Sequence, residues 1–186
     1  MAAMRGNAGA GGVFMALAAD RVVARETAVL SPHYKNMGNL FGSEYWTYLL
    51  PRRLGAAGAE RLMATRLPIL ARQARDLGLI DGCLPGDPAE AEEAALAEVR
   101  ATLAAPEFPA RLAAKAAARA ADAARKPLAA YRSAELARMR LNFFGFDPSY
   151  HVARHDFITR VPKSRTPLHL ARHRRSPARA LAHTTA

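Results

Sequence analysis

The residues with the clearest chemical potential lie in a glycine-rich stretch near the start of the chain. Residues 6–12 read Gly-Asn-Ala-Gly-Ala-Gly-Gly and lead directly into an apolar run that ends at Asp20. Glycines let a backbone turn sharply and approach a ligand, so the pattern predicts a loop that feeds the N-terminus of a helix. The first amides of a helix have no partner within it, and near Gly11 and Gly12 they can bind a thioester oxyanion or a phosphate. The other interpretation, in which the glycines only permit close helix packing, remains open.

The two best-known glycine loops do not fit this stretch. A P-loop requires Lys and then Ser or Thr after its last glycine, whereas Gly12 and Val13 follow Gly11 here. The dinucleotide fingerprint requires Gly-x-Gly-x-x-Gly after a full strand, and that spacing is also missing. The loop is therefore interpreted as an anion hole of another kind.

Other side chains that could do chemistry give weaker signals. Two pairs of histidines are spaced four residues apart, His151 with His155 and His169 with His173, and such a pair on a helix can bind zinc. Neither pair encloses a glutamate and both lie in segments bounded by prolines, so no metal is predicted. Cys83 stands in a predicted strand and is expected to be buried rather than nucleophilic.

Composition and charge restrict the class of protein. The chain has 186 residues, of which 51% are hydrophobic and 23% charged, and these values are typical of one soluble domain with its own core. The start lacks the apolar stretch of a signal peptide and the single cysteine permits no internal disulfide, so we expect a cytoplasmic protein with no membrane partner. The net charge of +11 comes mostly from Ala- and Arg-rich segments after residue 111 with few interleaved aromatics, so nucleic acid is an unlikely partner.

The elements that position the glycine loop alternate between short strands and helices. Asp87, Pro88 and Glu90 supply a cap, a first-turn proline and a capping-box acid, so a helix is predicted to begin there. Four prolines after Gly145 predict an extended segment. In chain order we expect a strand ending near residue 5, a helix at 12–19, strands at 21–24 and 28–30, a loop at 32–42, a helix capped by Ser43 that begins at Glu44, helices at 57–64 and 71–77, a strand at 79–84, and helices at 88–103, 110–124 and 128–142.

Several long motifs carry a resemblance to a known family. Residues 6–24 and 61–81 resemble the crotonase (enoyl-CoA hydratase/isomerase) family, and residues 33–53, 142–150 and 162–171 resemble the carboxy-terminal part of the HypX (HoxX) family of hydrogenase maturation proteins. The resemblance implies an α/β fold, a partial ClpP/crotonase-type spiral of ββα turns with a C-terminal helical region. It divides the chain into the second half of the crotonase-like core (1–105), the helical region (106–150) and an extended basic tail (151–186) with a disordered end.

The resemblance also implies which residues form the site. When the glycine loops are aligned, Ala8, Gly9, Gly11 and Gly12 bind the coenzyme A thioester, and Gly11 supplies an oxyanion amide. Phe14 and Tyr34 then occupy the positions of the two hydratase glutamates, which activate water and deliver a proton. This departure argues against enoyl-CoA hydration.

The remaining polar groups, Tyr34 and Glu44, become the candidate catalytic pair, although Tyr34 can also be a packed aromatic and Glu44 a helix-start acid. The HypX resemblance implies that they and Gly11 act on formyl-CoA and release carbon monoxide for the iron of nickel-iron hydrogenases, with an upstream formyltransferase-like domain as partner. Since the chain begins only five residues before Gly6, it is expected to be an amino-terminally truncated fragment that is negligibly active alone and prone to self-associate as a homo-oligomer. The alternatives are a generic hydratase or isomerase and a basic module that binds nucleic acid or protein.

Overall fold

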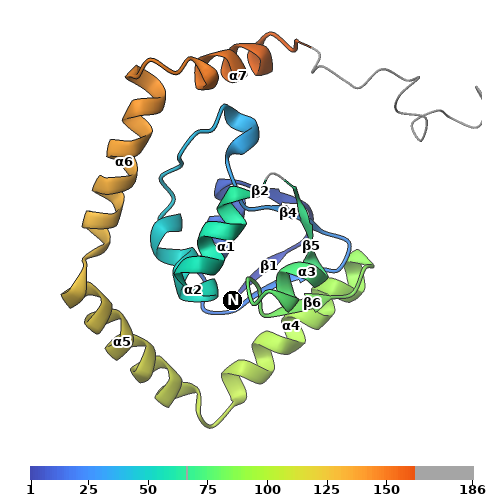
Figure 1. Cartoon of the computed structure of the whole chain (residues 1–186). Helices are drawn as coiled ribbons and strands as arrows, with labels where there is room; N and C mark the ends of the chain where they lie inside the picture. Colours follow the sequence, from blue (N-terminus) through green and yellow to red (C-terminus); the bar gives the residue numbers. More distant parts are fainter. Residues whose placement is uncertain (66, 162–186) are drawn as a thin grey trace, which may run out of the picture. The chain divides into compact units, whose positions relative to one another are not determined.

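The computed structural model describes residues 1–65 and 67–161, which Figure 1 shows coloured along the chain. The chain divides into two compact units, residues 1–154 and 155–186, and each is described by itself. In the first unit, strands and helices alternate up to residue 84, and the later described residues form helices without strands.

The strands of the first unit arise from a repeated structural turn. Each of the first two turns contributes one strand to each of two small sheets and then a helix. The first turn contains β1 (Ala2–Met4), β2 (Ala8–Gly9) and α1 (Gly11–Leu17), and the second contains β3 (Val22–Arg25), β4 (Val29–Ser31), a 3-10 turn η1 (Lys35–Met37) and α2 (Trp46–Ala64). They are followed by β5 (Ile69–Leu70), α3 (Ala71–Asp76) and β6 (Gly82–Leu84). This arrangement confirms the predicted partial spiral of ββα turns.

The two sheets differ in strand direction. The order β1-β3-β6 is parallel throughout, whereas β2-β4-β5 joins a parallel pair to an antiparallel one. The central strand β3 is buried on both faces, which explains its apolar run. Because side chains alternate along a strand, Val22 and Ala24 enter the main core while Val23 joins Leu84 and Ala91 on the other face.

Helix α1 provides the centre of the main core. Val13, Phe14 and Leu17 are buried on one face of this helix, whereas Met15 is 75% exposed on the other. The buried side chains belong to the same cluster as Leu30 of β4 and residues of α2. This spacing of apolar residues is that of an amphipathic helix, and the predicted helix after the glycine loop is confirmed.

The helical region consists of α4 (Pro88–Ala104), α5 (Phe108–Arg125), α6 (Leu128–Phe144) and α7 (Ser149–Ile158). The predicted start of α4 is confirmed, because one carboxylate oxygen of Asp87 accepts hydrogen bonds from the backbone amides of Ala89 and Glu90. Pro51 lies inside α2, and the non-helical Gly55, with φ +69°, divides that helix where a break between two helices was predicted.

The prediction of an extended segment after Gly145 is wrong for residues 149–158, which form α7. The reason is local: Pro148 stands directly before the helix, where a missing amide costs nothing, and no proline follows until residue 162. The rest of the predicted tail, residues 162–186, lies outside the described residues. Strand β5 was not predicted, and the division of the chain at residues 105 and 150 stays a prediction.

Replacing the cap of α4 should destabilise the chain by a limited amount. We expect Asp87→Ala to lower the free energy of unfolding by about 1 kcal/mol, because two amides at the helix start lose their acceptor. Urea denaturation measures the change. Asp87→Asn keeps an acceptor oxygen and should remain within a few tenths of a kcal/mol of the parent protein; equal losses in both variants would contradict the capping role.

Candidate functional site

The glycine loop is shorter than its sequence predicts. Ala8 and Gly9 form strand β2 and pair in parallel with Leu30 and Ser31 of β4. The turn into α1 is made by Ala10, which adopts a positive φ of +47° although it is not a glycine. The first hydrogen bonds of α1 run from the amides of Val13 and Phe14 to the carbonyl of Ala10, so Gly11 and Gly12 donate none within the helix.

Gly11 is placed directly against Glu44. A Cβ built on Gly11 would lie 3.3 Å from the Oε1 atom of Glu44 and 3.4 Å from its carboxyl carbon. Nine in ten real Cβ contacts are longer than this, so an alanine here would require the Glu44 carboxylate to move by a few tenths of an ångström. The structure thus brings Gly11 and Glu44 together, as the predicted site requires.

Tyr34 joins Gly11 and Glu44 in a cluster of three residues. Its hydroxyl donates a hydrogen bond to the Oε2 atom of Glu44, which also accepts one from the backbone amide of Ser43 at 2.9 Å. The Tyr34 ring is 4% exposed and stacks on Phe14, with 5.7 Å between ring centroids. The ring also lies against Gly42, where φ is +84° and a Cβ would fall 2.3 Å from the Cε2 atom of Tyr34.

The surroundings of Tyr34 favour its protonated form. Burial raises the pKa of the Tyr34 hydroxyl far above its ordinary value of 10.0, because a phenolate would lose its hydration. The hydrogen bond to Glu44 and the negative charges of Glu44 and Glu135 raise that pKa further. The Tyr34 hydroxyl therefore stays protonated at neutral pH and donates a hydrogen bond to Glu44.

The start of helix α2 differs from its prediction. The helix begins at Trp46 rather than Glu44, and its N-cap residue is Tyr45, which has a left-handed φ of +58° and makes no side-chain cap. Ser43 does not serve as the cap. Instead, the carboxylate of Glu135 on α6 accepts hydrogen bonds from the amides of Tyr45 and Thr47 at 2.8 and 2.9 Å.

The sequence analysis missed Glu135 altogether. Glu135 is completely buried, and it is the one buried carboxylate within residues 1–65 and 67–161. A signal was present, because Glu135 is the sole acidic residue between positions 128 and 144, in a segment that contains three arginines. Its partner could not be read from the sequence because the two amides lie about ninety residues away.

A groove opens beside Glu44, with a volume of about 820 Å³. Its walls come from α1, α2, α5, α6 and the turn before α2. They combine apolar side chains with five basic and two acidic ones: Phe14, Met15, Leu17, Ala18, Ala19, Asp20, Ser43, Glu44, Tyr45, Tyr48, Leu49, Arg52, Arg53, Lys115, Ala118, Arg119, Leu128 and Arg132. Arg52, Arg53 and Lys115 are paired with carboxylates, whereas Arg119 and Arg132 form no ion pair with the described part of the chain. The groove therefore offers an apolar wall and uncompensated positive charge beside the Tyr34–Glu44 pair.

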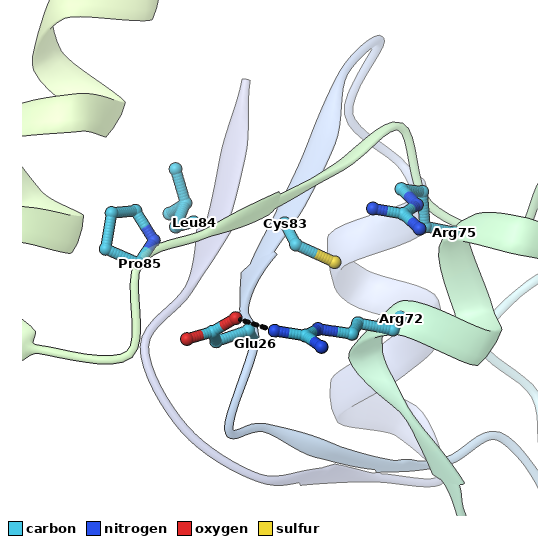
Figure 2. Close-up of a pocket in the computed structure, with 6 residues that line it drawn as sticks. All are labelled: Glu26, Arg72, Arg75, Cys83, Leu84 and Pro85. Atoms are coloured by element: carbon cyan, nitrogen blue, oxygen red, sulfur yellow. Dashed lines mark hydrogen bonds and ion pairs between the residues drawn. The ribbon is translucent and has the colours of Figure 1, made fainter.

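A second cavity, of about 430 Å³, surrounds Cys83 on β6 (Figure 2). The thiol lies between the side chains of Arg72 and Arg75, but each guanidinium already has a partner. Arg72 pairs with Glu26 and Arg75 with Asp76. Cys83 is half-buried, less than expected, and the cavity contains no catalytic partner for it among the six residues that line it.

Within the described ranges, no group of three or more histidine, cysteine or acidic side chains could hold a metal ion. His151 contacts the carbonyl of Phe143, and His155 lies beside Asp156. The predicted pair His169 and His173 lies outside the described residues. A search of the described helices also found none with the length and apolar character needed to cross a membrane.

The chain is similar to known proteins in both sequence and structure. The model of the enoyl-CoA hydratase/isomerase family matches residues 1–143. The hydrogenase maturation factor HoxX of Bradyrhizobium diazoefficiens is 59% identical over 95% of this chain, and the putative enoyl-CoA hydratase/isomerase YhaR of Bacillus subtilis is 40% identical over 48% of it. The structure of HypX from Aquifex aeolicus in complex with tetrahydrofolic acid has a TM-score of 0.83 and 44% identity over 94% of this chain. The chain spans only 31% of the length of HoxX, 35% of YhaR and 31% of that HypX chain.

Substitutions at two neighbouring glycines should distinguish the effect of helix propensity on stability from the effect of the contact with Glu44. We expect Gly12→Ala to be neutral or to stabilise the chain by up to about 1 kcal/mol, because its Cβ meets only the Cβ of Ala8 at 3.9 Å and alanine favours a helix. Gly11→Ala should gain less or lose stability, since its Cβ must displace the Glu44 carboxylate. Urea unfolding of both variants measures the difference, and equal effects would show that Gly11 has no special contact.

The raised pKa of Tyr34 predicts a pH-dependent contribution to stability. The pKa of Tyr34 is higher in the folded than in the unfolded chain. The protonated hydroxyl therefore stabilises the folded chain fully below about pH 10, and this stabilisation is lost as the pH rises towards the folded-state pKa. The stability of the parent chain relative to Tyr34→Phe should therefore fall above about pH 10, by about 1.4 kcal/mol per pH unit. Denaturation of both proteins across this range measures it. The other tyrosines cancel because both proteins share them, and a constant difference would contradict the shift.

Proposed function

The chain belongs to the enoyl-CoA hydratase/isomerase family, and we propose that it forms the coenzyme A-binding, carbon monoxide-releasing part of a HypX-type hydrogenase maturation protein. The observation that carries this proposal is the partly buried hydrogen bond between Tyr34 and Glu44, next to Gly11. It supplies a base and a proton donor within one small cluster, where the resemblance puts the thioester carbonyl.

The composition of the cluster argues against hydration of a double bond. The position of one hydratase glutamate is occupied by Phe14, which is completely buried and stacks on Tyr34. An aromatic ring cannot activate water or deliver a proton. One carboxylate with an adjacent phenol suits a reaction that moves a single proton from carbon to sulfur.

The proposed reaction splits formyl-CoA into carbon monoxide and free CoA. The amide of Gly11 holds the formyl oxygen, and Glu44 accepts the formyl proton. The bond between carbon and sulfur breaks, its electron pair leaves with sulfur, and the electrons of the lost C–H bond become the lone pair of carbon monoxide. Tyr34 then protonates the thiolate and recovers its proton from Glu44, so the two side chains end in their starting state.

The groove supports the binding of a CoA thioester. It adjoins Glu44 and combines an apolar wall with the free positive charges of Arg119 and Arg132. The phosphates of CoA are complementary to such charges, and an apolar wall suits the pantetheine arm. The tetrahydrofolic acid bound to the Aquifex HypX supports a one-carbon supply from an upstream formyltransferase-like domain in the complete protein.

The decisive test uses a chimera in which this chain replaces the matching carboxy-terminal part of Bradyrhizobium HoxX. With formyl-CoA as substrate, we expect Tyr34→Phe and Glu44→Gln to lower CO release by at least about a hundredfold, as is typical when a positioned acid or base is lost. Trapping by reduced haemoglobin measures the CO, and calorimetry should show that both variants still bind CoA.

The control is Tyr150→Phe, which removes a hydroxyl from a ring packed on Phe143, away from the residues that line the groove. Its CO release should equal that of the parent chimera. Undiminished CO release from Tyr34→Phe would remove Tyr34 from the mechanism. Absence of CO release from the parent chimera that binds CoA would refute the proposed reaction but not the CoA site.

A further inference from the structure

Helix α6 holds the segment that carries Glu44 at two positions. Asn142 accepts a hydrogen bond from the amide of Phe41 at 3.0 Å and donates one to the carbonyl of Asn39 at 3.3 Å. Glu135, seven residues earlier and so on the same face of α6, binds the turn at Tyr45 and Thr47. Residues 39–47 are therefore fixed at both ends by one helix of the C-terminal region.

Glu135 makes three hydrogen bonds, all to the first turn of α2. Besides the two amides, its Oε1 atom accepts one from the Thr47 hydroxyl at 2.6 Å. A carboxylate at this position caps the helix and favourably meets the positive end of its dipole. Because Glu135 is completely buried and Tyr45 and Thr47 are half-buried, losing the carboxylate would leave two partly buried amides without their acceptor.

The capped turn has a strained backbone. Tyr45 has a φ of +58°, a left-handed conformation that residues other than glycine rarely adopt. The hydrogen bond from the Tyr45 amide to Glu135 holds the backbone in this conformation. Glu44 is the preceding residue, so the direction of its side chain towards Tyr34 and Gly11 depends on this turn.

We propose that Glu135 is a positioning residue: by capping α2 from α6, it holds the Tyr45 turn and so keeps the Glu44 carboxylate aimed at Tyr34 and Gly11. The role of Glu135 rests on the proposed function only in so far as Gly11, Tyr34 and Glu44 are taken to be catalytic. The geometric claim concerns the Tyr34–Glu44 pair and can be tested without CoA or formyl-CoA.

The test follows the Tyr34 hydroxyl in the whole chain labelled with 3-fluorotyrosine, by fluorine NMR. Tyr34→Phe assigns the Tyr34 signal, and Glu44→Gln gives its position when the carboxylate is lost. We expect Glu135→Gln and Glu135→Ala to move the Tyr34 signal towards that of Glu44→Gln. Hydrogen exchange of the Tyr45 and Thr47 amides should accelerate at least about tenfold, the size expected when bonds to a buried carboxylate are lost.

Two control variants separate positioning from general stability. Asp122→Asn removes another carboxylate that joins the helical region to α2, through Tyr48 and Arg52, without touching the Tyr45 turn. Thr47→Val removes the hydroxyl bond but keeps both amide bonds. Both variants should leave the Tyr34 signal in place.

Other outcomes would overturn the inference. If the two amides exchange faster in Glu135→Gln but the Tyr34 signal does not move, Glu135 is a cap with no influence on the pair. If the signals of all tyrosines collapse in Glu135→Gln as well as Glu135→Ala, the carboxylate holds the whole fold rather than this turn, and the inference is rejected. A shifted Tyr34 signal in Glu135→Gln, together with a parent chimera that binds no CoA, would uphold the positioning role while refuting the proposed function.

Discussion

The packing of helix α1 into the core is the constraint on which the rest of the structure depends. Its buried face, formed by Val13, Phe14 and Leu17, joins the two small sheets to α2 in one apolar cluster. The same packing determines where the glycines before the helix lie and which side chain can approach them. Phe14 then provides the surface on which Tyr34 stacks, so this side chain belongs to both the core and the candidate site.

The candidate site combines the fold of the family with polar residues in an apolar environment. The family resemblance implies that Phe14 and Tyr34 stand where hydratases have two carboxylates, and the carboxylate that the structure places beside Tyr34 is that of Glu44. Burial keeps the phenol protonated, which makes it a hydrogen-bond donor to Glu44 at neutral pH. The spiral of ββα turns thus remains, while the chemistry available at its centre differs.

Helices α5 and α6 add no fully buried apolar side chain to the core of the first unit. Helix α5 has no buried residue, and Glu135 is the single residue of α6 that is fully buried. A buried carboxylate with several donors is tolerated because each polar group finds a partner. This dependence links the helical region directly to the geometry beside Tyr34.

The sequence by itself determined most of the order of the elements, the spiral class of fold, the cap at Asp87 and the identity of Gly11, Tyr34 and Glu44 as candidates, because propensity, local spacing and family resemblance are all properties of the chain order. It did not place the tight turn at Ala10, the helix in residues 149–158 or the cap on α2. The tertiary structure decided these features. The amides of Tyr45 and Thr47 meet Glu135 only because folding brings together residues about ninety positions apart, and no local pattern encodes that contact.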